Sequence, residues 1–134
     1  MEQLAWKEKL IAFSENQKKT IIENLCEIVQ NGTYGKDYTV APREKNRKLR
    51  QLYCVDDAKV KEILLSLREE DCIAVEDSNN MNHLGDVVCK FKKHYLLIPK
   101  WKEDADYESV PLYIKMVIPD VGDPLFIISL HIDE

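Results

Sequence analysis

The sequence lacks any apolar run close to the roughly 20 residues that a membrane-spanning helix needs. Its first residues lack the basic-then-apolar pattern of a secretory signal. We therefore expect a cytoplasmic protein with no membrane partner. At 134 residues the chain is long enough for one compact domain and too short for two. The prediction is a single domain over residues 1–134, with a helical arm over 1–33 and an α+β core over 34–134.

The chain also lacks paired-cysteine motifs. Its four cysteines are far apart, with no CxxC and no Cys/His pair at zinc spacing. This pattern is typical of buried or half-buried thiols in a reducing compartment. We therefore expect no metal site, and nothing in the sequence indicates a cofactor. The four residues are Cys26, Cys54, Cys72 and Cys89.

An excess of positive charge is absent too, because the formal net charge is −5. This argues mildly against a nucleic-acid-binding protein, whose contact surface should be basic. The bases are nevertheless clustered, and two clusters could converge on one patch. The alternative is that both are solvated faces, as most charge runs are. The clusters are Arg43, Lys45, Arg47, Lys48 and Arg50, and then Lys90, Lys92, Lys93, His94, Lys100 and Lys102.

Apolar spacing predicts helices in the first half of the chain. One covers residues 4–13, and a second runs from Ser14 to about residue 30, with an amphipathic stripe. The alternative is one long kinked helix over both segments. A basic helix follows over 43–52, and Asp56 and Asp57 cap another whose buried stripe includes Val60 and Ile63. Residues 33–40 are expected to form a loop or a short extended segment.

The second half of the chain has the composition of strands. Residues 86–92 alternate between two faces, and a turn at Lys93 and His94 leads to a short strand over 95–98. Residues 72–82 and 99–108 are interpreted as loops. Two apolar runs, 110–118 and 125–132, flank a Pro/Gly/Asp turn and predict a hairpin. The expected fold is α+β, with N-terminal helices packed on one face of a four-stranded, mainly antiparallel sheet.

The hairpin places chemically active side chains on one face. Tyr113 and Lys115 share a face, because side chains alternate along a strand. On the partner strand the same alternation places His131 on one face together with Ser129 and Ile127. A phenol, an ammonium and an imidazole on neighbouring strands are the parts of a metal-free ribonuclease site. The alternatives are a half-buried tyrosine, an exposed lysine and a surface histidine, all frequent in strands.

Five segments of the chain match a pattern known from one protein family. Residues 40–46 and 57–67, the latter with Asp71, are similar to its opening and its helix. Gly85 and Asp86, followed by Phe91 and Lys93, are similar to one of its strands. Residues 113–115 and 128–131 are similar to its two last strands. The five segments occur in the same order as in that family, so the chain resembles the MqsR-like family of small bacterial toxins.

The resemblance implies a RelE/barnase-type fold and an mRNA-cleaving toxin that a cognate antitoxin neutralises. It implies catalytic roles for His131, Tyr113, Lys115 and Lys93. Histidine is the natural acid and base, because it alone titrates near neutrality when unperturbed. The RNA, either free or on the ribosome, would contact the basic side chains. These are Arg43, Lys45, Arg47, Lys48, Arg50, Lys90 and Lys92.

Two hypotheses follow for the function. The first is a metal-independent endoribonuclease toxin that cleaves single-stranded mRNA by 2′-hydroxyl attack. The second is a non-catalytic protein on the same fold, a phage or mobile-element inhibitor or regulator that binds a protein partner through acidic surfaces. The set of Tyr113, Lys115 and His131 favours the first hypothesis, and the net negative charge favours the second.

Overall fold

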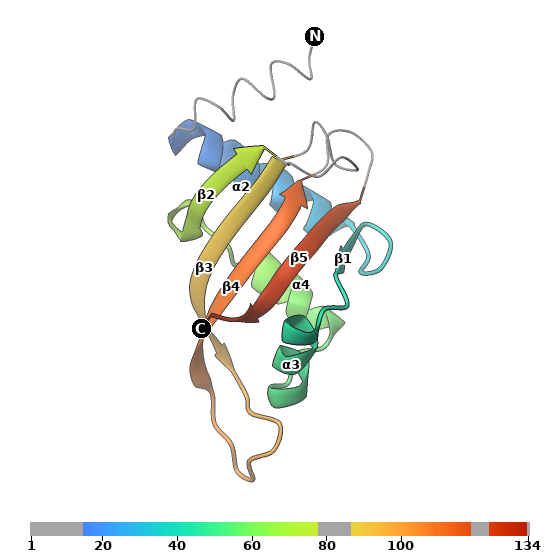
Figure 1. The fold of residues 1–134 in the computed structure, drawn as a ribbon, viewed down its shortest axis with the longest axis vertical. Helices are drawn as coiled ribbons and strands as arrows, with labels where there is room; N and C mark the ends of the chain where they lie inside the picture. The colour runs from blue at the N-terminus through green and yellow to red at the C-terminus, as the bar shows by residue number, and fades with distance from the viewer. Residues whose placement is uncertain (1–14, 78–86, 119–123, 134) are drawn as a thin grey trace.

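The structure is a computed structural model that describes residues 15–77, 87–118 and 124–133. Within these ranges five strands form one mixed sheet in the order β1-β5-β4-β3-β2 (Figure 1). Strand β1 runs parallel to β5, and the other neighbours are antiparallel. The strands are β1 (Tyr38–Val40), β2 (Cys72–Asp77), β3 (Val87–Leu97), β4 (Glu108–Ile118) and β5 (Leu125–Ile132).

The sheet therefore corrects the prediction of four strands. The α+β class and the mainly antiparallel pairing are confirmed. Strand β1 comes from a segment interpreted as a loop or extended piece, and β2 from one interpreted as a loop. The turn expected at Lys93 and His94 is wrong, because β3 continues through both residues and pairs with β4 as far as Leu97.

Three α-helices occur in the described part of the chain, close to the positions that the sequence predicts. Helices α2 and α4 lie behind the sheet in Figure 1 and cover one of its faces. The cap predicted for α4 is present, because an Asp56 carboxylate oxygen accepts the Lys59 N–H at 2.8 Å. The helix expected over 4–13 lies outside the described residues. The helices are α2 (Glu15–Asn31), α3 (Glu44–Leu52) and α4 (Asp57–Leu65), and the 3₁₀ turn η1 (Glu69–Asp71) follows them.

One hydrophobic core lies between the helices and the sheet. Leu25 of α2 and Ile63 of α4 are fully buried against Phe91 of β3 and Ile114 of β4. No helix of the described residues is long and apolar enough to cross a membrane. Since α2 and α4 occupy this face, the opposite face of β3, β4 and β5 carries the polar side chains.

Helix α3 packs against β5 at the end where β1 has already finished (Figure 1). Buried Asn46 makes the connection. Its side-chain amide donates to the Ile128 carbonyl at 2.9 Å, and its side-chain oxygen accepts the Leu130 N–H at 2.9 Å. Strand β1 ends before this part of β5. The Asn46 side chain takes its place, because it pairs with a backbone carbonyl and a backbone N–H of β5 that would otherwise lack a partner strand.

Candidate functional site

The strand register brings together three of the four predicted catalytic residues. Tyr113 lies directly opposite His131, and Lys115 lies opposite Ser129. On the other side of β4, Lys92 lies opposite Tyr113 and Lys90 opposite Lys115. Neighbouring strands are about 4.8 Å apart, so each row is compact. We call this set the open-face cluster. It consists of one row, Lys92–Tyr113–His131, and a second row, Lys90–Lys115–Ser129.

A β-bulge in β5 corrects one detail of the predicted faces. Ser129 lies opposite Lys115, whereas Ile127 lies opposite Met116 and is fully buried in the core. The extra residue between them is Ile128, so Ile127 does not share the face of His131 as simple alternation predicts. The bulge lets β5 bury Leu125, Ile127 and Leu130 in the core and still present His131 on the open face.

The His131 ring is oriented by the backbone carbonyl of the next residue. Its Nδ1 lies 2.8 Å from the Ile132 carbonyl oxygen. A carbonyl can only accept, so Nδ1 carries a hydrogen and the neutral ring keeps its lone pair on Nε2. The ring centroids of His131 and Tyr113 are 5.4 Å apart, with the planes tilted by 39°. The phenol and the imidazole are therefore close enough to act on one small group.

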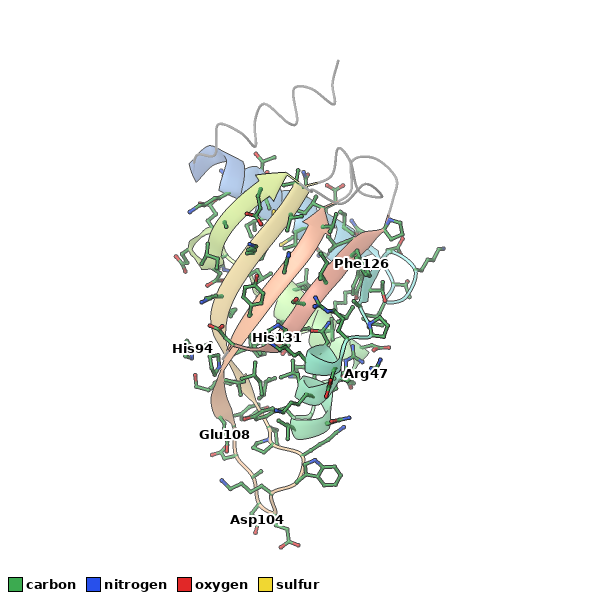
Figure 2. The ribbon with its side chains drawn as sticks, viewed as in Figure 1. Arg47, His94, Asp104, Glu108, Phe126 and His131 are labelled. Atoms are coloured by element: carbon green, nitrogen blue, oxygen red, sulfur yellow. The ribbon has the colours of Figure 1, made fainter. Side chains whose placement is uncertain are left out.

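Helix α3 adds positive charge beside His131. Lys45 and Lys48 line a hollow of about 20 Å³ together with His131 and Ile132. Figure 2 shows His131 at the end of β5 that α3 approaches. Lys45 and Lys48 of the first basic cluster thus approach the open face on which Lys90 and Lys92 of the second cluster lie.

The three arginines of the first cluster do not line the hollow beside His131. Arg50 donates to the Asp57 carboxylate at 3.1 Å and to the Tyr34 hydroxyl at 3.3 Å. Arg47 donates to the Pro42 carbonyl at 2.6 Å. Arg43 is the exposed residue that precedes α3. Arg50 therefore ties α3 to α4 and to the segment before β1, while Lys45 and Lys48 approach the open-face cluster.

Two carboxylates that the sequence reasoning missed lie against the cluster. The Lys90 ammonium contacts Glu76 at 2.8 Å, and the Lys92 ammonium contacts Asp133 at 3.4 Å. The hydrogen bond from Lys90, then the charges of Lys90 and Lys115, lower the pKa of Glu76. Glu76 was missed because β2 was interpreted as a loop. Asp133 could have been predicted from the sequence, because it lies two residues after His131 and alternation places both on the same face.

Lys93 does not join the other predicted catalytic residues. It lies opposite buried Leu112, on the sheet face that the helices cover. Its ammonium donates to the Ser66 carbonyl at 2.8 Å and to the Asp71 carboxylate at 3.3 Å. The continuous β3 strand explains this placement, since Lys93 follows Phe91 in the two-residue alternation. Lys93 joins the end of α4 to η1 and β3.

Three of the four cysteines are buried or half-buried, as the sequence predicts. Cys72 and Cys89 are buried, and burial raises the pKa of the Cys89 thiol. Cys26 is half-buried, but Cys54 is exposed, contrary to expectation. Within residues 15–77, 87–118 and 124–133 no group of three or more His, Cys, Asp or Glu side chains could hold a metal ion.

Comparisons with protein-family models, curated proteins and solved structures found no match for this chain.

Proposed function

We propose that this protein is a metal-independent endoribonuclease toxin that cleaves single-stranded mRNA on the open face of its sheet. The observation that carries the proposal is the adjacency of Tyr113 and His131 in one row, with Lys115 in the next. The resemblance to MqsR-like toxins supports the same activity. It also supports a RelE-like fold, a cytoplasmic location and a cognate antitoxin as partner.

The proposed reaction divides the proton transfers between His131 and Tyr113. Its Nε2 accepts the proton of a ribose 2′-hydroxyl, and the oxygen attacks the adjacent phosphorus. The bond to the 5′-oxygen breaks, leaving a 2′,3′-cyclic phosphate and a 5′-hydroxyl. Tyr113 donates the proton that the departing 5′-oxygen requires. The Lys115 ammonium stabilises the charge that develops on the phosphoryl oxygens.

The surroundings of the cluster fit an extended single strand. The face is formed by three adjacent strands, and Lys45 and Lys48 extend its positive charge past His131. Phosphates of the RNA would displace Glu76 and Asp133 from Lys90 and Lys92. Contacts of this kind hold the backbone without reading the base sequence.

Cleavage of matched RNAs in EDTA tests this chemistry. One RNA is unmodified, and the other carries a 2′-O-methyl group at each position that the protein cuts. The proposal predicts cleavage of the first RNA to 2′,3′-cyclic phosphate ends and no cleavage of the second. Equal cleavage of both RNAs would contradict it, because a methylated oxygen cannot act as the nucleophile. The pair is repeated with ribosomes present.

A second candidate function is a non-catalytic inhibitor or regulator encoded by a phage or mobile element. The net charge of −5 and the carboxylates against Lys90 and Lys92 favour it. It predicts that neither RNA is cut, with or without ribosomes. Its partner would be a protein bound through acidic surfaces.

A further inference from the structure

The hairpin of β3 and β4 extends beyond the rest of the sheet. Residues 94–97 and 108–111 pair as a two-stranded ribbon, and residues 98–107 close its end. We call residues 94–111 the β3–β4 projection. Figure 1 shows it at the opposite end of the molecule from α2, and Figure 2 places Asp104 at its tip.

The β3–β4 projection is fixed to the end of α3. The Cys54 N–H donates to the Ile98 carbonyl at 2.8 Å, and the Lys100 N–H donates to the Leu52 carbonyl at 2.9 Å. The Trp101 indole N–H donates to the Gln51 carbonyl at 2.7 Å, although the residue is 82% exposed. An exposed aromatic ring that is already oriented loses little conformational entropy when a partner covers it.

Apolar side chains gather around the projection. The exposed large hydrophobic residues of the described ranges include Leu52, Leu96, Trp101 and Tyr107, all in or beside it. Two hollows lie here, one of about 260 Å³ and one of about 450 Å³. Leu52 and Trp101 line the smaller hollow, and Leu96 and Tyr107 line the larger one. Such hollows suit apolar anchor residues of a protein partner.

The tip of the β3–β4 projection is acidic, and its charge indicates which kind of partner could bind there. Glu103, Asp104 and Asp106 are exposed, and none of them forms an ion pair with another described residue. The nearby Lys102 is already engaged by Glu108 at 3.6 Å. Carboxylates at an interface repel phosphate groups and attract cations. The tip therefore disfavours RNA and anionic lipid, and it favours a chain rich in lysine or arginine.

We propose that the β3–β4 projection is a docking surface for a basic protein segment that places apolar side chains beside Trp101 and Tyr107. This surface is separate from the open-face cluster, and the inference does not depend on RNA cleavage. Trp101 and Tyr107 supply the buried anchors, and the acidic tip supplies attraction and orientation.

Anisotropy of fluorescein-labelled synthetic peptides tests the proposal. Three peptides of equal length are compared: a Leu/Lys amphipathic peptide, a Leu/Glu counterpart and a Lys/Ser peptide without apolar residues. The Leu/Lys peptide should bind wild type at least about tenfold more tightly than either other peptide. Equal binding of the Leu/Glu peptide, or of the Lys/Ser peptide, would overturn the proposal.

Two sets of variants locate the binding. The variant W101S/Y107S removes the apolar anchors, and E103K/D104N/D106K removes the acidic tip. Asparagine is used at Asp104 because this residue has a φ of 53°, which asparagine tolerates. Each variant should weaken the Leu/Lys peptide by at least about tenfold. Thermal unfolding checks that both variants fold, and binding as tight as in wild type would contradict the docking surface.

A matched control separates docking from general attraction to an acidic protein. The variant E23K/E27K/E70Q makes the same total change of charge at exposed positions of α2 and η1. It should change peptide affinity by less than about twofold. An equal loss in this control would overturn the proposal. The proposal would also be overturned if the W101S/Y107S variant lost affinity for a labelled single-stranded RNA but not for the Leu/Lys peptide.

Discussion

Adjacent lysines of one strand have different environments. Lys92 is on the open face beside Asp133, whereas Lys93 is on the covered face and contacts Ser66 and Asp71. Alternation over residues 86–92 correctly placed Lys90 and Lys92. It missed Lys93 because a turn was predicted there. The sequence resemblance brought Lys93 into the catalytic set, but the register removes it from the open-face cluster.

Replacing Lys93 with methionine should destabilise the fold. Both the Lys93 and Asp71 side chains are less than one-fifth exposed. Losing the ammonium leaves the Ser66 carbonyl and the Asp71 carboxylate without this donor. The expected decrease in the free energy of unfolding is about 1–3 kcal/mol, measured in urea.

The matched control for that experiment is Lys92→Met. The Lys92 side chain is about half exposed, so losing its ion pair should change the free energy of unfolding by no more than about 0.5 kcal/mol. Equal loss in the two variants would contradict the separation of these lysines onto two faces. RNA cleavage by Lys93→Met, measured below its unfolding temperature, should match that of wild type.

At the scale of elements, long and strongly patterned segments were predictable and short ones were not. Helices α3 and α4 and the final hairpin are where the sequence indicates. Strand β1 has three residues, and its parallel partner β5 lies far along the chain, so no local pattern marks the pairing. Strand β2 begins with the apolar residues 72–75, but acidic residues and an Asn-rich segment follow, and the whole stretch was therefore interpreted as a loop. It lies at an edge of the sheet, where charge is tolerated.

Helix α4 is joined to β3 through Glu62, which makes stability depend on pH. The Tyr95 hydroxyl and the Lys59 ammonium both donate to the Glu62 carboxylate. These hydrogen bonds, the Tyr95 bond first, hold the pKa of Glu62 below its usual value of 4.5. The folded protein thus binds this proton more weakly than the unfolded chain. The stabilisation is present above the unfolded pKa and is lost as the pH falls through the folded pKa.

Comparing wild type with Glu62→Gln checks this link. The difference in their free energies of unfolding should shrink as the pH falls from about 6 to about 3. In a Tyr95→Phe background the same difference should depend less on pH, because the first donor is gone. A difference that grew on acidification would contradict the assignment. Urea unfolding at a series of pH values supplies the data.

At the scale of the whole molecule, the net charge was a poor guide to individual surfaces. The chain has 24 acidic and 19 basic residues, yet Lys45, Lys48 and Lys115 lie around His131. The acidic residues Glu103, Asp104 and Asp106 lie at the far tip of the β3–β4 projection. The sequence left open whether its two basic clusters converge on one patch or are separate solvated faces. The approach of Lys45 and Lys48 to the open face depends on the packing of α3 against β5, which the hydrogen bonds of Asn46 hold and which no local pattern predicts.

The candidate site was therefore predictable in part. Hairpin alternation brought Tyr113, Lys115 and His131 together correctly, because a two-residue period needs only the strand assignment. The carboxylates of Glu76 and Asp133, the bulge at Ile128 and the approach of Lys45 and Lys48 depend on register and tertiary packing.

The most direct test of the account is cleavage of a long single-stranded RNA in EDTA by wild type, His131→Ala and His94→Ala. His94 is the matched control, because it is exposed on the β3–β4 projection and its ring contacts the Ser109 hydroxyl at 3.5 Å. The account predicts cleavage by wild type and His94→Ala, and a loss of about 10²–10⁴-fold in His131→Ala. Cleavage that survived in His131→Ala would remove the proposed base. No cleavage by any of the three proteins, with ribosomes also present, would contradict the nuclease itself.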